Sequence, residues 1–476
     1  MGVLSVGAAQ TPEWTVRPSL VKAQHFLLDL RIAEAEALLR SEDSIHNALS
    51  NFLKARALFF QHYVESEHST LGSDAQRFDR IVESLGANQP EQQPERLAAL
   101  AELHLMRAFI QLRSGAQWGA AKDGFRAFQR ISELRERYPQ HPLGRFAQGL
   151  ISATAGSLPK DYAWITRLVG IEGNVSEGMA LMQGALDHPG MRTDPVFGTE
   201  LAYMYLLIRY HLLDDAQGSL TDYGCDPSQS SFLLYLETQL LMASGQNDQA
   251  IALLIGRPRG PDRVPYPLMD LITGKALLNK LDARSPTWFL RYLNASKAVD
   301  RPFSALRYLW WEAKLTGNEE KAVFYADKMR KRNPVAEADR QASIDFEAGF
   351  NPVLVRSRLL FDGGYYRDAL RELTARPLEQ SCPSEVEKLE YRYRYGHVLY
   401  KLGRLDEAEV FLRAAALCDQ PTYYCAASHL YFGEVLARNG KRDEALKQYR
   451  IAQELKGYPF DEGVQRTAKA RTQSLP

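Results

Sequence analysis

A pattern of small residues near the C-terminus constrains the fold more than any other feature of the chain. The segment GHVLYKLGRLDEAEVFLRAA, from Gly396, aligns with GEVLARNGKRDEALKQYRIA, from Gly433, and the matched positions lie 37 residues apart. In each segment a second glycine follows after seven residues, and alanines follow after twelve and nineteen. Small residues at this spacing let two antiparallel helices approach closely. The pattern therefore predicts a helix hairpin that is repeated along the chain.

The same small positions can be traced upstream with declining fidelity. They predict hairpins from near residue 18 to near residue 470. Each hairpin is marked by a turn glycine, a second-helix alanine or both: Gly364 and Ala369, Gly317 and Ala322, Gly245 and Ala250, Ala216, Gly115 and Ala120 with Ala108 and Ala127, and Ala23 with Ala35.

This arrangement resembles the tetratricopeptide repeat, a helix hairpin of 34 residues with small residues at fixed positions. The resemblance implies an all-α fold, a right-handed α-solenoid of stacked antiparallel helix hairpins. More loosely, the stretch from Tyr162 to Leu186 and the early AEAEALL are similar to the inclusion body clearance and tetratricopeptide repeat protein 39 family. That likeness implies a role in protein quality control or lipid-related homeostasis, but its motif of hydrophobic and small residues is too loose to transfer it.

The stretch EYRYRYGHVLYK, Glu390 to Lys401, alternates tyrosine with arginine, as in a half-exposed strand or a base-stacking surface. Its place in the repeat predicts the first helix of a hairpin instead, with Tyr391 and Tyr395 on one side and Tyr393 and His397 on another. Lysine plus arginine and aspartate plus glutamate number 58 each, so the chain carries no overall charge that favours nucleic acid.

The repeats predict four regions in one continuous solenoid. Residues 1–14 form a disordered N-terminus or the remnant of a signal peptide, residues 15–200 irregular helical repeats, residues 201–335 tetratricopeptide-like repeats, and residues 336–476 the C-terminal tetratricopeptide repeats. We expect a long polar interruption from Asp74 to Pro90, and an inter-unit loop or bend in LLIGRPRGPDRVPYPLMD. The start MGVLSVGAAQTPEW leaves an exported or periplasmic protein and a cytoplasmic one both open.

The four cysteines, Cys225, Cys382, Cys418 and Cys425, contain no CxxC pair and no metal-ligand pattern with histidine. A disulfide within the C-terminal group of three is one alternative, and small buried hydrophobic residues are the other. No apolar run approaches the roughly 20 residues that span a bilayer.

In the related superfamily the first helices line a concave surface that binds an extended or helical segment of another protein. Trp, Tyr and Arg there resemble interface hot spots, although Tyr and Trp also fill gaps between neighbouring units. Some members grip a C-terminal carboxylate with lysine, asparagine and arginine, a set that this chain does not reproduce. The groove-facing positions are Arg307, Trp311, Lys314 and Leu315; Tyr393, His397, Tyr400 and Lys401; and Leu430, Glu434, Ala437 and Arg438.

No motif for phosphate, dinucleotide, acyl-transfer or zinc-protease chemistry is present, so we expect no cofactor and no enzyme. His397 lacks a nucleophile or carboxylate at a fixed spacing, which favours a hydrogen-bonding role. The stretch HYVESEH places Glu65 three residues from His62 and His68. The two histidines point to different sides of a helix, so a solvated polar face is expected rather than a metal site.

The sequence predicts a non-enzymatic protein–protein interaction scaffold that presents a concave groove to a segment of a partner protein. Two alternatives stay open. One is an enzyme or enzyme regulator with a site in the irregular region 74–186, which would gather titratable residues in a closed cavity. The other is a structural subunit of a larger assembly, which would expose an extended apolar patch on its convex side.

Overall fold

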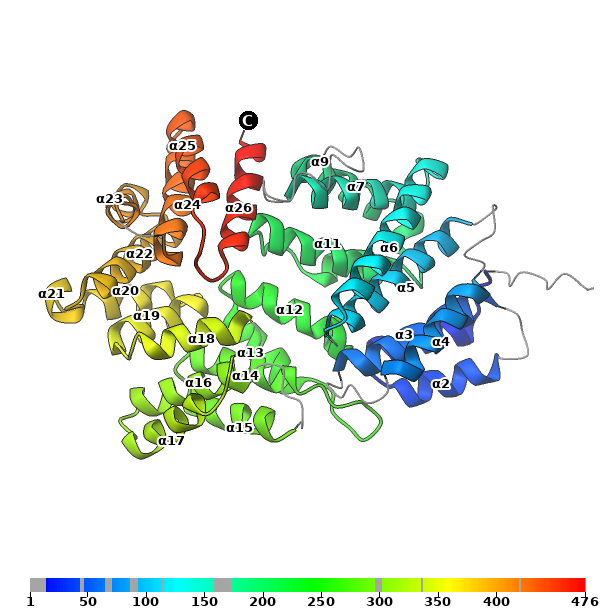
Figure 1. The fold of residues 1–476 in the computed structure, drawn as a ribbon, viewed down its shortest axis with the longest axis horizontal. Coiled ribbons are helices and arrows are strands. Elements are labelled where there is room, and N and C mark those ends of the chain that lie inside the picture. Colours follow the sequence, from blue (N-terminus) through cyan, green and yellow to red (C-terminus); the bar gives the residue numbers. More distant parts are fainter. Residues whose placement is uncertain are drawn as a thin grey trace, which may run out of the picture.

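The structure is a computed structural model that describes residues 14–42, 47–64, 71–85, 93–113, 115–157, 173–295, 302–334, 337–418 and 421–475. These ranges contain helices and connecting turns but no strand, which confirms the predicted all-α class. Figure 1 shows the helices running from the N-terminal group, through a central group around α12 and α14, to the C-terminal group around α22 and α24. Residues 1–13 of the predicted N-terminal segment lie outside the described ranges.

Several of the N-terminal helices form pairs that pack on one another, namely α1 with α2, α5 with α6 and α7 with α9. The helices of this part are α1 (Pro18–Leu28), α2 (Ile32–Ser41), α3 (Ala48–Val64), α4 (Leu71–Ser84), α5 (Pro94–Arg113), α6 (Gln117–Arg137), α7 (Pro142–Ser157), α9 (Val175–Leu186), α10 (Pro189–Arg192) and α11 (Gly198–Leu213).

The rest of the chain is dominated by hairpins. Its central elements are η2 (Leu220–Tyr223), η3 (Pro227–Gln229), α12 (Ser231–Ala243), α13 (Asn247–Gly256), α14 (Leu268–Asn279), α15 (Ser285–Ala295), α16 (Pro302–Leu315), α17 (Glu319–Arg330) and α18 (Glu337–Glu347). Its C-terminal helices are α19 (Pro352–Asp362), α20 (Tyr366–Thr374), α21 (Leu378–Ser381), α22 (Glu385–Lys401), α23 (Leu405–Ala416), α24 (Tyr423–Arg438), α25 (Arg442–Glu454) and α26 (Asp461–Ser474).

The small residues of the repeat lie where close helix packing requires them. The hairpins α1–α2, α5–α6, α12–α13, α16–α17, α19–α20, α22–α23 and α24–α25 each pack internally. The alanines of the second helices are buried. In each of these hairpins except α1–α2, the glycine after the first helix adopts a positive φ angle. The predicted glycines are Gly115, Gly245, Gly317, Gly364, Gly403 and Gly440; the alanines are Ala35, Ala120, Ala250, Ala322, Ala369, Ala408 and Ala445.

Two sequence predictions were wrong. The region from Asp74 onward was expected to be a polar interruption, but α4 continues through it to Ser84, because Phe78 and Leu85 bury an apolar side of that helix. Ala216 was expected in the second helix of a hairpin, but α11 ends at Leu213 and is followed by the short turns η2 and η3. Glycines and a proline in this connection break a longer helix.

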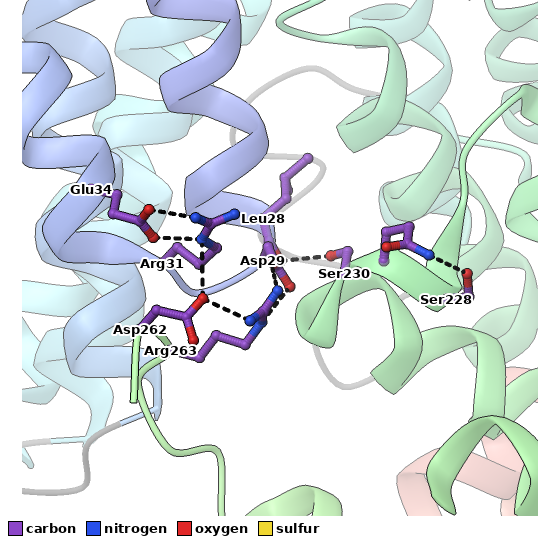
Figure 2. Close-up of polar contacts among 9 residues, drawn as sticks. Leu28, Asp29, Arg31, Glu34, Ser228, Ser230, Asp262 and Arg263 are labelled. Atoms are coloured by element: carbon purple, nitrogen blue, oxygen red, sulfur yellow. Dashed lines mark hydrogen bonds and ion pairs between the residues drawn. The ribbon is translucent and has the colours of Figure 1, made fainter. Parts of the chain in front are cut away.

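The proline-rich connection between α13 and α14 is an inter-unit loop, as predicted, and it also packs on the first hairpin. Figure 2 shows Arg263 donating hydrogen bonds of 2.6 and 3.2 Å to the carboxylate of Asp29, and Asp262 lying 3.3 Å from Arg31. The backbone N–H of Val264 donates to the carbonyl of Leu30 at 2.9 Å. The loop therefore contacts a distant part of the chain, since Arg263 and Asp29 are 234 residues apart in the sequence.

The helix α26 packs between the last hairpin and helices of the N-terminal half of the chain. It packs against α24 and α25 on one side and against α7, α9 and α11 on the other, as Figure 1 also shows. Ala468 belongs to the C-terminal hydrophobic core, whereas Ala470 belongs to the N-terminal core. Gln473 accepts a hydrogen bond of 3.2 Å from the backbone N–H of Val175. One helix thus contributes side chains to two separate cores.

A disulfide links Cys418 and Cys425 across the connection between α23 and α24, with their Cα atoms 6.0 Å apart. That separation lies within the usual range for bridged cysteines. Cys225 and Cys382 are buried and unbridged. Both sequence alternatives therefore hold, each for a different pair of cysteines.

Candidate functional site

A large cavity lies between helices of successive hairpins. Its volume is about 1260 Å³, and its walls come from α12, α14, α16, α18, α19, α22 and α24, with α11 and α26 on the remaining side. We call this cavity the central chamber. Figure 1 shows these helices arranged around the loop that precedes α26. The residues that line the chamber run from Tyr210 to Thr467 in the sequence.

Aromatic side chains form one wall of the central chamber. The ring of His397 stacks on Tyr431, with centroids 3.8 Å apart, and lies 4.4 Å from the ring of Phe361. The hydroxyl of Tyr393 lies 3.2 Å from Nδ1 of His397, and both side chains are buried. These residues come from α19, α22 and α24, so the wall depends on the packing of three hairpins.

His397 is held as a neutral imidazole. Burial lowers the pKa of His397 well below its usual value, and the nearby cations Lys401 and Arg394 lower it further. Nε2 of His397 is buried without a hydrogen-bond partner among the described residues. The side chain therefore offers a neutral hydrogen-bonding group in an aromatic wall, and it forms no bond to a carboxylate that would support general-base catalysis.

Buried ion pairs form a second wall. Asp345 on α18 pairs with Arg358 at 2.9 Å and with Arg307. Burial acts to raise the pKa of Asp345, but the two guanidinium groups outweigh it and hold the pKa at about 2. On α22 the guanidinium of Arg394 lies 2.6 Å from Glu390, and that carboxylate overcomes the effect of burial and raises the pKa of Arg394. These charges are paired with each other, so the wall carries little net charge.

The rim of the central chamber is apolar and exposed at two positions. Ile344 on α18 and Val386 on α22 both line the chamber, although 45% and 66% of their surfaces are exposed. Lys401, at the C-terminal end of α22, also lines the chamber and is exposed. The chamber therefore opens to solvent beside hydrophobic side chains that the fold leaves uncovered.

A segment of the chain itself occupies part of the chamber. Residues 457–460, between α25 and α26, contribute to the lining, and the side chain of Tyr458 is buried there. Phe460 is in the left-handed region at φ 63° and also lines a smaller adjoining cavity of about 230 Å³. The wall of the chamber therefore includes a connecting loop, which the repeat pattern did not predict.

The residues predicted to face the groove fall into two sets. Trp311, Tyr393, His397, Lys401 and Leu430 line the central chamber, and Arg307 lines the smaller cavity. The others pack at the sides of their helices: the hydroxyl of Tyr400 donates to Glu434 at 3.3 Å, Arg438 lies over the ring of Tyr400 at 4.5 Å, and Lys314 pairs with Glu319 at 2.9 Å. The tyrosine at 400 therefore fills the space between hairpins.

Sequence reasoning missed Asp345, Arg358 and Tyr431. Asp345 lies on α18, a helix to which the repeat pattern assigned no position. Tyr431 follows the predicted position Leu430 by one residue and stacks directly on His397. The repeat pattern gave no signal for Asp345. Tyr431 would have been found if the residues next to each predicted groove position had also been considered.

The described residues contain no group of three or more histidine, cysteine, aspartate or glutamate side chains that could hold a metal ion. Glu65 and His68 lie outside the described ranges, and His62 is buried on α3. None of the described helices combines the length and the apolar composition of a membrane span. No family model matches the chain, and no curated protein matches it.

Proposed function

We propose that this protein is a non-enzymatic scaffold of tetratricopeptide-like hairpins, wound as a right-handed α-solenoid, whose central chamber takes a segment of a partner protein. One observation carries the proposal: a single chamber is lined by side chains from successive hairpins between α12 and α24. Small-molecule pockets have volumes of about 300–1,000 Å³. The chamber, at about 1260 Å³, exceeds that range and suits a peptide segment.

The chemistry of the chamber favours binding over catalysis. The ion pairs Asp345–Arg358 and Arg394–Glu390 satisfy one another, and His397 is neutral and buried. The half-buried ring of Tyr431 and the exposed side chains of Ile344 and Val386 remain for a partner to contact. Tyrosine is among the residue types that contribute most to protein interfaces.

The enzyme alternative locates a site in residues 74–186, where His104 and Asp123 form a pair at 3.3 Å between Nδ1 and Oδ1. Such a pair is the base and orienting group of many hydrolytic sites. Here the two side chains are 4% and 2% exposed, so a substrate does not reach them. The pair holds α5 against α6. Residues 86–92, 114 and 158–172 of this region lie outside the described ranges.

One observation favours the structural-subunit alternative. Trp118 and Phe125 on α6 are 91% and 54% exposed, and Leu112 at the end of α5 is 60% exposed. Exposed aromatic side chains of this size mark protein interaction sites when they are contiguous. The two surfaces, chamber rim and α6, therefore need to be compared in one experiment.

The test is affinity capture from an extract of the native host with four forms of the full chain. The rim variant is Ile344→Asp with Val386→Asp. The matched control is Val410→Asp with Val323→Asp, since each of these valines is 64% exposed and neither lines the chamber. The α6 variant is Trp118→Gln with Phe125→Gln. All are checked for folding by circular dichroism.

We expect a protein that wild type and the valine control retain and the rim variant loses. Retention by the rim variant together with loss by the α6 variant would assign the partner to the structural-subunit alternative. Equal retention by all four forms would show that the partner binds neither at the chamber rim nor at α6.

A further inference from the structure

Three arginines surround one tryptophan on the side of the hairpin α14–α15. The guanidinium carbons of Arg257, Arg259 and Arg291 lie 5.3, 4.8 and 4.8 Å from the centre of the Trp288 ring. Arg257 and Arg259 belong to the proline-rich loop after α13, whereas Trp288 and Arg291 belong to α15. The chain therefore brings three cations from two elements to one aromatic ring.

The negative charge at this cluster does not balance its positive charge. Among the described residues, Asp270 on α14 is the carboxylate that pairs with the cluster, through Arg257 and, at 3.8 Å, through Arg291. Arg257 also donates to the hydroxyl of Thr273 at 3.0 Å and is 7% exposed, so it is a satisfied structural group. Arg259 forms no hydrogen bond or ion pair with the described residues.

The positive charges of the three arginines repel one another. Burial lowers the pKa of Arg257 to about 10 despite Asp270, and Arg259 and Arg291 contribute to the lowering. Each exposed cation–π contact stabilises a fold only weakly. A fold that needed cations on this ring only for stability would not require three of them beside one carboxylate.

The loop that carries Arg259 is held at both ends. Arg257 anchors its start through the backbone carbonyl of Leu254 at 2.6 Å. Arg263 anchors its other end on Asp29, the contact drawn in Figure 2. Pro258 and Pro261 further restrict the backbone between these anchors. Arg259 is therefore presented beside Arg291 by a restrained loop, which reduces the entropy that a bound anion would otherwise cost.

We propose that Arg259 and Arg291 form a binding site for a phosphate group. Their guanidinium groups lie over the Trp288 ring beside Arg257. The cluster carries three positive charges against one negative charge, so a dianion neutralises it, whereas a single carboxylate leaves one charge in excess. Planar guanidinium groups also match the oxygen geometry of phosphate through paired N–H donors. Free phosphate compounds and lipid headgroups share this chemistry, and the experiment separates them.

The probe is inorganic pyrophosphate, titrated into the full chain by isothermal calorimetry at constant ionic strength. We compare wild type, the double variant Arg259→Gln with Arg291→Gln, and the control Arg284→Gln. Arg284 is a suitable control because it is 63% exposed, close to the 50% of Arg291, and pairs with Asp282 outside the cluster. Thermal unfolding in chloride buffer checks that the variants fold; removal of like charges should leave the melting temperature unchanged or higher.

We expect wild type and the Arg284 control to bind pyrophosphate equally, and the double variant to bind at least about tenfold more weakly. A second arm measures co-sedimentation with phosphatidylcholine vesicles that contain phosphatidic acid. Vesicle binding that depends on Arg259 and Arg291 would assign the phosphate to a lipid headgroup, and pyrophosphate binding alone to a soluble compound. The proposal is overturned if wild type binds neither probe, or if the double variant binds as wild type does.

Discussion

At the scale of single residues, the wall of the central chamber contains polar groups whose protonation state is set by burial. His397 illustrates this, because its ring lies between Phe361 and Tyr431 and its Nδ1 atom lies beside the Tyr393 hydroxyl. Burial and the cations Lys401 and Arg394 lower the pKa of this histidine well below its usual value. The folded protein therefore resists protonation that the unfolded chain accepts.

This resistance predicts a pH-dependent contribution to stability. Above the unfolded pKa of about 6.5 neither state binds the proton, and His397 adds no pH dependence. As pH falls below that value the unfolded chain takes up a proton that the folded protein refuses, so stability is lost at up to about 1.4 kcal/mol per pH unit. His397→Phe removes this loss.

The measurement is chemical denaturation of wild type and His397→Phe at a series of pH values from 7 to 5. We expect the difference in unfolding free energy to move in favour of the variant as the pH falls. Other titrating groups cancel in this difference. A difference that stays constant over the range would show that His397 has the same pKa in the folded protein as in the unfolded chain.

The places that the predicted groove residues take in the structure also belong to this scale. Helical periodicity placed Tyr393, His397 and Lys401 on one side of a helix, and all three line the chamber. The same count included Tyr400, which instead bonds Glu434 between hairpins. Sequence spacing gives the direction of a side chain around its own helix, but the neighbouring hairpin decides whether that direction leads to a cavity or to an interface.

At the scale of elements, the hairpins were predictable because their turns need glycine for a steric reason. Gly364 ends α19 at φ +77°, and a Cβ atom there would lie 2.2 Å from the Cα of Gly245. Gly403 ends α22 at φ +75° with nothing within 4 Å of such an atom. The first glycine is required both by its backbone angle and by the approach of another turn, whereas the second is required by its angle alone.

We therefore expect unequal costs for the same substitution at these two turns. Gly403→Ala should lower the unfolding free energy by about 1–2 kcal/mol, the cost of left-handed geometry for an L residue. Gly364→Ala should add about 1–3 kcal/mol to that cost, because the two turns must move apart. Urea denaturation of both variants measures the difference, and equal costs would mean that the turns are not in contact.

What could not be predicted at this scale is which hairpins meet when they are distant in sequence. The approach of Gly245 to Gly364 depends on how far each hairpin rotates relative to the last, and small rotations accumulate along an array. The predicted interruption after Asp74 failed for a different reason. Its polar composition hid the buried apolar positions Phe78 and Leu85 that make α4 a helix.

At the scale of the whole molecule, α26 connects the C-terminal core with the N-terminal core. Its Ala468 packs in the C-terminal core and its Ala470 in the N-terminal core, and both are fully buried. No periodicity within the helix indicates that its two faces belong to cores built from opposite ends of the chain. This connection could be found only from the structure.

The substitution Ala470→Glu tests this closure. A carboxylate buried without a partner should cost about 3 kcal/mol or more and detach α26 from α7, α9 and α11. We expect a larger radius of gyration by small-angle X-ray scattering, with helical content retained. Ser474→Glu, at an exposed position of the same helix, is the control. An unchanged radius for Ala470→Glu would show that other contacts hold the ends together.

The position of α26 along the chain has a consequence for synthesis. Its hydrogen bond to Val175 joins residues 298 positions apart. At a translation rate of about 5–20 residues per second, α9 leaves the ribosome about 15–60 seconds before its partner exists. During that interval the apolar surface of α7, α9 and α11 that α26 later covers is open to water and to other chains. Safe folding of this protein in the cell therefore depends on what shields that surface until α26 arrives.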